Sequence, residues 1–362
     1  MKLKITLLAV FYIILLNAQA PAGYYNAANG LSGYPLKTAL HQIITNSHIP
    51  QAYSTHWSFF ETADVKQDGT VWDIYANCGF IFGLPINGGN QDVGTGGNVE
   101  CQFFNREHSF PTSWFGGNVE PMRSDVVHIY PADKLVNNER GNLAFANVNL
   151  VSFLSSNGSK KGSSATTGIT GNVFEVADEY KGDIARSLFY MATRYQDMIA
   201  GWETNNPDGD KMLNGTSNQV FETWALQLLY SWHINDPVSQ KEINRNNAIY
   251  AYQGNRNPFV DNPDYVCNIW NVSNCTLSVP EINFENAITV YPNPSNNQTI
   301  SIESSIELDE IQLISINGQL LQVIQKENIT ANQLQINSIP SGFYLLKVKS
   351  NNQYLVKKII IN

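Results

Sequence analysis

The sequence predicts an α+β domain followed by a small all-β sandwich. Up to Cys275, amphipathic helical stripes alternate with loops rich in glycine and asparagine. Beyond that point aromatic residues become scarce, and short runs of Ile, Leu and Val surround an Asn-Gly turn. A chain of 362 residues, 43% of them hydrophobic, is also longer than one compact core usually requires, so we expect at least two folded units.

The first twenty residues have the layout of a secretory signal. Lys2 and Lys4 precede the apolar run 5–16, and Ala18-Gln19-Ala20 supplies the small residues of a cleavage site. This run is too short to span a bilayer comfortably, so we expect an exported protein with no membrane span. We also expect the protein to be a monomer. The predicted parts are a signal at 1–20, a first domain at 21–275, a linker at 276–286 and the sandwich at 287–362.

Helical spacing of apolar residues predicts three helices in the first domain, at 35–47, 183–202 and 219–233. The second is the clearest, with Gly182 before it as a break. Its apolar stripe consists of Ile184, Leu188, Met191, Tyr195 and Ile199. The stretch 253–261, dense in Asn and Arg, is interpreted as a hydrogen-bonded structural clasp.

Four cysteines fit an oxidising compartment, and none forms a C-x-x-C pair of the kind used by zinc or redox sites. Proximity in the sequence favours disulfides between Cys78 and Cys101 and between Cys267 and Cys275. Four cysteines permit three connectivities, and free thiols are the alternative.

The formal charge is −9, and it becomes −11 once Lys2 and Lys4 are lost with the signal. Proteins that grip nucleic acid over an extended surface are normally basic, because neutralised phosphates release counterions. An acidic chain that acts on nucleic acid must therefore concentrate its few cations near the reacting phosphate, and it should bind weakly and turn over.

The segment 105–111, Asn-Arg-Glu-His-Ser-Phe-Pro, places a histidine beside a carboxylate. Asn137 lies 29 residues after His108, which allows a strand, a return strand and the start of a helix, so both ends can converge on one ion. The oxygen ligands Glu107 and Asn137 suit Mg²⁺ better than zinc. A base that activates water, beside a cation that neutralises charge growing on phosphorus, is what phosphodiester hydrolysis requires.

The same segments closely resemble the endonuclease I family, the secreted and periplasmic bacterial nucleases of the His-Me finger (ββα-metal) class. The resemblance rests on 105–111, on Ser-Asp-Val-Val-His-Ile-Tyr-Pro-Ala-Asp at 124–133 and on Val-Asn-Asn-Glu-Arg-Gly-Asn at 136–142. Further sequence motifs typical of the family lie at 71–75, 173–175, 181–186, 236–238 and 253–259, so the resemblance covers nearly all of 21–275.

Membership of this family implies a ββα-metal site with His108 as general base. Glu107 and Asn137 would then hold a single Mg²⁺, or another divalent ion such as Mn²⁺ or Ca²⁺. Neutral His108 would take a proton from the attacking water, while the metal stabilises the phosphate and supplies an acidic water to the 3′ oxygen. Neighbouring strand residues point to opposite faces, so we expect Glu107 and His108 to flank the phosphate.

Other residues of these words are assigned by their chemistry. Asn138 is an alternative to Asn137 as the metal ligand. We prefer Asn137 because it directly follows Val136, as in the Val-Asn motif of the family. A purely structural role as a helix cap is the alternative for Asn137. Arg140 is assigned to catalysis as a phosphate-binding group, with an internal ion pair as an equal alternative. We expect hydrogen bonds that brace the site from Asp125, His128 and Asn142.

The region after the linker predicts a set of short strands. Asn317-Gly318 separates 311–316 from 320–324, which indicates a two-residue hairpin turn because both residue types tolerate positive φ. Within 344–349, apolar Tyr344, Leu346 and Val348 alternate with residues of a mostly charged face. A small sandwich follows from these strands.

This region resembles the type A sorting domain of type IX secretion. The resemblance is carried by Tyr-Pro-Asn-Pro at 291–294, the Asn-Gly turn, Gly-Phe-Tyr-Leu-Leu at 342–346 and Lys-Lys-Ile-Ile-Ile at 357–361. It implies export through the periplasm and across the outer membrane by the type IX secretion machinery, often with removal of this domain. An accessory binding sandwich is the alternative.

We therefore expect a secreted or cell-surface, Mg²⁺-dependent endonuclease that hydrolyses DNA, with RNA left open as a substrate. The alternative from another class is a surface adhesin or binding module that kept the fold and lost activity. Phosphate contacts are blind to the sugar, so the sequence does not decide between DNA and RNA.

Overall fold

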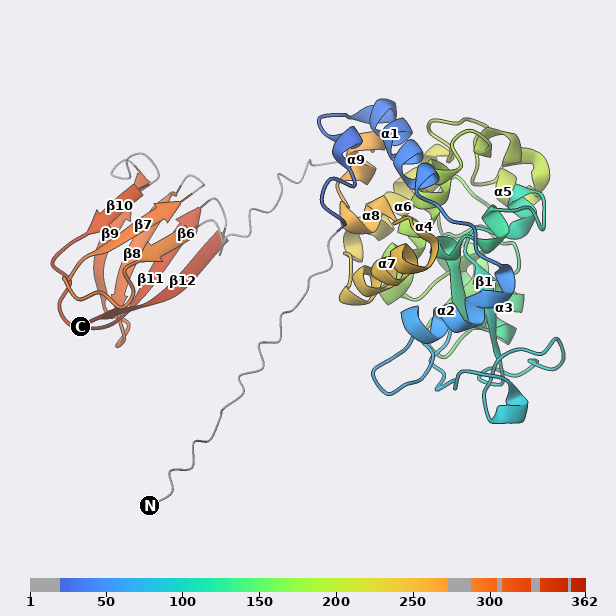
Figure 1. Cartoon of the computed structure of the whole chain (residues 1–362), viewed down its shortest axis with the longest axis horizontal. Helices are drawn as coiled ribbons and strands as arrows, with labels where there is room; N and C mark the ends of the chain where they lie inside the picture. The colour runs from blue at the N-terminus through green and yellow to red at the C-terminus, as the bar shows by residue number, and fades with distance from the viewer. Residues whose placement is uncertain (1–19, 273–287, 305–307, 327–332, 351–352) are drawn as a thin grey trace, which may run out of the picture. The chain divides into compact units, whose positions relative to one another are not determined.

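The computed structural model describes residues 20–272, 288–304, 308–326, 333–350 and 353–362. The chain divides into two compact units, Met1–Leu277 and Ser278–Asn362 (Figure 1). The predicted linker and nearly all of the predicted signal lie outside the described residues. The predicted disulfide between Cys267 and Cys275 also falls there, because Cys275 is not described.

The first unit combines helices with two small sheets. Its helices are α1 (Gly33–Asn46), α2 (His56–Ala63), α3 (Lys134–Arg140), α4 (Lys181–Arg194), α5 (Pro207–Asp210), α6 (Thr223–Asn235), α7 (Gln240–Gln253), α8 (Pro258–Asp261) and α9 (Tyr265–Trp270). Strands β1 (Phe104–His108) and β2 (Ile129–Asp133) form one sheet, and β3 (Val148–Leu154), β4 (Lys160–Ser164) and β5 (Asn172–Glu175) form the other. The α+β prediction is confirmed for this unit.

Helix α4 lies at the centre of the first unit and is buried from Gly182 to Arg194. It contacts α1, α6 and α8. The helix is shorter than predicted: the backbone leaves the helical region at Tyr195, and 199–205 follow as a 3₁₀ turn. The prediction that Gly182 breaks the chain before this helix is wrong. Gly182 lies inside α4, where a Cβ atom would sit 2.1 Å from the carbonyl oxygen of Asp236, so only glycine permits this approach.

The other helices agree with the prediction to different degrees. Helix α1 agrees with it, but α6 begins at Thr223 rather than at 219, because Val220 has a φ of +69° and Phe221 pairs with Leu213 in a β-bridge. Helix α7 was not predicted. A capping box begins it, in which Ser239 and Glu242 accept from each other's backbone amides.

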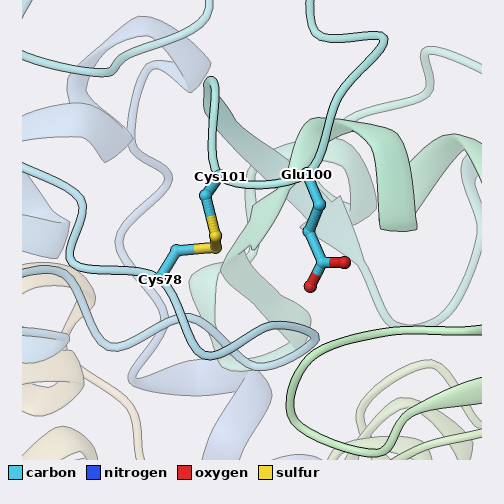
Figure 2. A group of neighbouring side chains, drawn as sticks. All are labelled: Cys78, Glu100 and Cys101. Carbon is cyan, nitrogen blue, oxygen red and sulfur yellow. A yellow bond between two sulfur atoms is a disulfide. The ribbon is translucent and has the colours of Figure 1, made fainter.

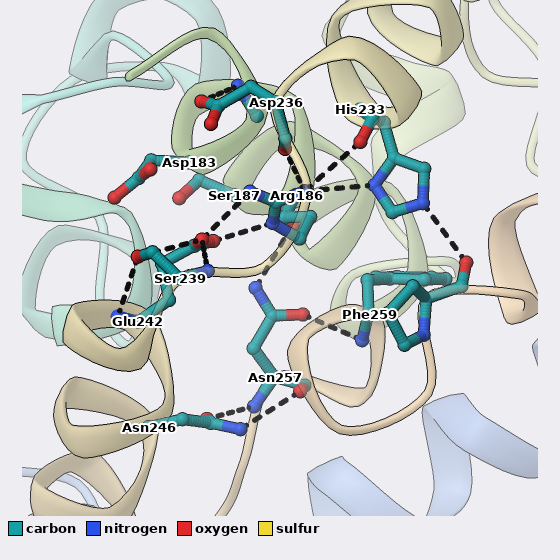
Figure 3. Close-up of polar contacts among 12 residues, drawn as sticks. Asp183, Arg186, Ser187, His233, Asp236, Ser239, Glu242, Asn246, Asn257 and Phe259 are labelled. Carbon is teal, nitrogen blue, oxygen red and sulfur yellow. Dashed lines mark hydrogen bonds and ion pairs between the residues drawn. The ribbon is translucent and has the colours of Figure 1, made fainter. Parts of the chain in front are cut away.

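A buried polar network joins α4 to α7 and to the stretch 253–261 (Figure 3). Arg186 donates to both carboxylate oxygens of Glu242, and the amide of Asn257 donates to the carbonyl of Arg186 at 3.0 Å. Asn246 in turn exchanges two hydrogen bonds with the backbone of Asn257. The predicted structural clasp is confirmed by these contacts.

The second unit is the predicted all-β sandwich. One sheet has the order β10 (Gln333–Ile336), β7 (Ile300–Ser304), β6 (Ile288–Tyr291), and the other has β12 (Gln353–Ile361), β11 (Gly342–Ser350), β8 (Glu310–Ser315), β9 (Leu320–Gln325). Buried residues of both sheets share one apolar core, including the predicted Tyr344, Leu346 and Val348. The turn is longer than predicted, because four residues, from Ile316 to Gln319, separate β8 from β9.

Candidate active site

A strand, a return strand and a helix build the site, as the spacing predicted. Strand β1 runs antiparallel to β2, with Glu107 opposite Tyr130 and His108 opposite Ile129. Helix α3 follows β2 at once, and the carboxylate of Asp133 caps it by accepting from the amide of Val136 at 3.0 Å. This short connection brings α3 against β1 and β2.

Glu107 is held through one of its two carboxylate oxygens. Its side chain is 2% exposed, and its Oε1 accepts a 2.7 Å hydrogen bond from the Tyr75 hydroxyl and pairs with Nη1 of Arg140 at 3.0 Å. Burial raises the pKa of Glu107, while the charge of Arg140 and the Tyr75 bond act against that rise. Oε2 has no hydrogen-bond partner among the described residues and is not sealed from solvent.

Asn137 is fixed by its amide nitrogen. Its Nδ2 donates to Oδ1 of Asn105 at 2.7 Å, and Asn105 lies on the same face of β1 as Glu107. The amide oxygen of Asn137 therefore stays available on the face that carries the carboxylate. The competing Asn138 is exposed, with no such tie to β1 in the part of the chain that the structure describes.

His108 is oriented on the opposite face of β1. Its Nε2 lies 2.9 Å from the carbonyl oxygen of Arg123, which can only accept, so the ring proton is on Nε2 and Nδ1 is unprotonated. The imidazole stacks on Tyr53 with ring centroids 5.6 Å apart, and the His128 ring lies at 5.3 Å. Burial, reinforced by His128, lowers the pKa of His108 well below its ordinary value, which keeps the imidazole neutral.

Arg140 lies behind Glu107. It is 1% exposed, and besides its ion pair with Glu107 it donates to the carbonyl oxygens of His108 at 3.0 Å and Ser109 at 2.8 Å. Direct contact with a substrate phosphate does not fit this burial. The alternative assignment, an internal ion pair, agrees with the geometry.

The three expected bracing residues differ in their surroundings. Asp125 is buried and accepts hydrogen bonds from the hydroxyls of Tyr190 (2.8 Å) and Tyr195 (2.9 Å). The buried His128 contacts the Met122 carbonyl through Nε2 at 2.8 Å. Asn142 is exposed, and only its backbone carbonyl takes part in a bond, from the indole of Trp114, within the part of the chain that the structure describes.

Sequence reasoning missed four side chains around the site. Tyr75 holds Glu107, Tyr53 stacks on His108, and the guanidinium groups of Arg106 and Arg123 lie 3.6 Å and 4.4 Å from the centroid of the Tyr53 ring. Tyr75 and Arg106 lie inside words that carry the family resemblance, but nothing in their spacing reveals which groups they contact.

The donor set fits a hard divalent ion. Oε2 of Glu107 and the amide oxygen of Asn137 are oxygen ligands without protein partners in the described ranges, which Mg²⁺, Mn²⁺ and Ca²⁺ accept. Among described residues, the one cluster of three His, Cys, Asp or Glu ligand atoms is Cys78, Glu100 and Cys101. The sulfur atoms of Cys78 and Cys101 are joined as the predicted disulfide, so they offer no thiolate to a metal (Figure 2).

Comparison with known proteins places the first unit in a family. Residues 32–264 match the family model of Endonuclease I, whose members generally depend on a divalent metal. Two proteins named extracellular ribonuclease are similar. The one from Bacillus amyloliquefaciens is 36% identical over 68% of this chain and 78% of its own length. The one from Bacillus subtilis (strain 168) is 35% identical over 71% of this chain and 83% of its own.

The second unit has its own match. Residues 289–362 match the secretion system C-terminal sorting domain of type IX secretion. A match that covers 23% of this chain and 12% of PorZ, a surface component of the type IX system of Porphyromonas gingivalis, has a TM-score of 0.20 and 14% identity.

Together these matches show where the protein is located and to which class of enzyme it belongs. Within the residues that the structure describes, no helix combines the length and apolar character that a bilayer crossing demands. The sorting domain and the extracellular relatives show a secreted or cell-surface protein, and the nuclease matches show a hydrolase that acts on nucleic acids. With a family match across most of its length, the chain belongs to the endonuclease I family.

Proposed function

We propose that this protein is a divalent-metal-dependent endonuclease that hydrolyses phosphodiester bonds of both DNA and RNA. The observation that carries the proposal is the pairing of a neutral, oriented His108 with an open carboxylate oxygen on the neighbouring Glu107. The names of the two Bacillus relatives support RNA as a substrate. Phosphate recognition does not depend on the sugar, which supports DNA as well.

In the proposed mechanism, Nδ1 of His108 takes a proton from the attacking water. The bond from Nε2 to the Arg123 carbonyl holds the tautomer in which Nδ1 is the basic nitrogen. Tyr53 keeps the imidazole plane fixed by stacking. Because the ring is neutral and already oriented, it can act as a base without first losing a proton.

Glu107 and Asn137 would hold the divalent ion through their open oxygens. When bound, such an ion neutralises charge on the phosphate and assists departure of the 3′ oxygen. Arg140 and Tyr75 act as positioning residues, because both hold Oε1 of Glu107, which leaves Oε2 without a protein partner among the described residues. Arg123, with a side chain 33% exposed beside His108, is the better placed cation to contact the scissile phosphate.

The test is digestion of plasmid, single-stranded DNA and RNA side by side by the purified chain, with Mg²⁺ and with chelator. We expect cleavage of all three with Mg²⁺ and none with chelator. His108→Ala should lower kcat about 10²–10⁴-fold, the usual contribution of a general base. Unimpaired cleavage by that variant would refute the base assignment. A gel shift without cleavage under any divalent ion would favour the binding module instead.

A further inference from the structure

Arg106 lies on the same face of β1 as the base. It precedes His108 by two residues, and side chains at this interval project from one face of a strand, about 7 Å apart. Glu107, between them, projects to the other face with Asn105. A nucleic acid strand whose scissile phosphate meets His108 would therefore pass Arg106 at about the next phosphate.

The guanidinium group of Arg106 is held in a defined orientation. Its Nη1 donates to the carbonyl oxygen of Tyr53 at 2.7 Å, and its Cζ lies 3.6 Å from the centroid of the Tyr53 ring and 4.6 Å from that of the Trp57 ring. Stacking on two rings reduces the freedom that an arginine would otherwise lose on binding an anion.

The charge of Arg106 has no close counterion. In the described ranges, no carboxylate lies within 4.0 Å of its nitrogens, and neither Nε nor Nη2 has an acceptor or is sealed from solvent. Arg123 brings a second guanidinium to the same Tyr53 ring, at 4.4 Å, with one carboxylate oxygen of Glu120 at 4.0 Å. The whole chain has a net charge of −9, but few carboxylates lie close to these two arginines to neutralise their positive charge. Their guanidinium groups are therefore suited to bind an anion.

We propose that Arg106 forms a binding subsite for the phosphate adjacent to the cleaved bond, with its stacked guanidinium donating through Nε and Nη2. A phosphate oxygen pair matches the fork of these two donors. The subsite rests on the proposed function, because its ligand is the substrate of that reaction. It gives the enzyme a requirement for more than one nucleotide around the cleavage point.

The test uses the full chain carrying His108→Ala and a short labelled single-stranded DNA. Its phosphates are replaced one at a time by uncharged methylphosphonate, and affinity is measured by fluorescence anisotropy. We expect a loss of about tenfold at the phosphate next to the scissile one, and this loss should vanish when Arg106→Gln is added. In the Arg106→Gln variant, the slope of log affinity against log salt concentration should also decrease by about 1, which corresponds to the loss of one phosphate contact.

Two controls separate charge from fold. Arg106→Lys keeps the charge without the planar fork and should retain part of the methylphosphonate penalty. Lys66→Gln removes a cation elsewhere and should leave the penalty unchanged. If the wild-type chain cleaves nucleic acid while Arg106→Gln keeps every penalty, the subsite alone is overturned. If the wild-type chain cleaves nothing, the proposed function falls, and the subsite with it.

Discussion

The two carboxylate oxygens of Glu107 differ in their protein contacts, and this difference leaves one of them free to bind a metal ion in the proposed mechanism. Oε1 is occupied by Tyr75 and Arg140, while Oε2 stays open in the described part of the chain. From the sequence, Glu107 could be proposed as a metal ligand and His108 as the base, because the two residues adjoin in a motif that carries the family resemblance. Sequence reasoning left the internal ion pair of Arg140 as one of two equal alternatives, and it did not predict that Tyr75, 32 residues away, would donate to Glu107, because such contacts depend on how distant segments pack.

Tyr75→Phe should weaken binding of a divalent metal about 10–100-fold, because a carboxylate ligand that loses an orienting hydrogen bond binds less well. The aromatic ring, packed 4.9 Å from Phe174, is retained in this variant. Binding of Mn²⁺ by calorimetry measures the effect. Tyr180→Phe, which removes a hydroxyl bonded to Trp72, serves as the matched control and should bind Mn²⁺ normally. Equal affinities in the two variants would contradict the role of Tyr75.

Lys37 is a second residue with a measurable signature. It is fully buried, and its ammonium group donates to the carbonyl oxygens of Ser217 and Asn218. Burial lowers its pKa from 10.5 to about 7. Between these values the unfolded chain binds the proton and the folded chain does not. The free energy of unfolding should therefore rise with pH across this window, and the stabilisation is lost as pH falls towards 7.

Lys37→Met isolates that contribution. The difference in unfolding free energy between wild type and variant should change by up to about 1.4 kcal/mol per pH unit between about pH 7 and 10, in favour of wild type as pH rises. Urea denaturation at several pH values measures it. A difference that stays constant with pH would show that the folded pKa of Lys37 is not lowered.

Among the elements, ion pairs of opposite burial should differ in strength. Arg186 and Glu242 join α4 to α7 with side chains 1% and 5% exposed, whereas Asp178, paired with Lys181, is 93% exposed. Glu242→Gln should cost about 3–5 kcal/mol at about pH 8, because it leaves a buried charge without its partner. Asp178→Asn should cost far less, because solvent screens an exposed pair. Equal losses on urea denaturation would contradict the structural importance of the network in Figure 3.

The elements also show where prediction from sequence succeeds. Strand β11 and helix α1 followed from periodicity, because each buries one regular face. Helix α4 was placed correctly but given the wrong end, since the apolar stripe continues through Tyr195 and Ile199 while the backbone changes to a 3₁₀ turn. Helix α7 was missed because its buried face includes Glu242, Arg245 and Asn246, and polar residues buried in pairs leave no apolar stripe.

At the scale of the whole molecule, the two units predict a processing event. If the sorting domain serves export alone, protein recovered outside a bacterium that has type IX secretion should lack about the last 75 residues. Intact mass measurement of the extracellular protein decides this. Extracellular protein that still ends at Asn362, free of the cell, would instead favour a permanent binding sandwich. The shortened chain should digest nucleic acid as fast as the full chain.

In the proposed mechanism, the base and the metal ligands are separate groups around one phosphate. This separation can be measured by Mn²⁺ titration of three variants of the full chain. We predict that His108→Ala binds one Mn²⁺ per chain as wild type does, although it no longer cleaves nucleic acid, and that Glu107→Ala and Asn137→Ala lose the ion. Loss of Mn²⁺ binding in His108→Ala, or full binding in Glu107→Ala, would show that the base and the metal ligands are not separate groups.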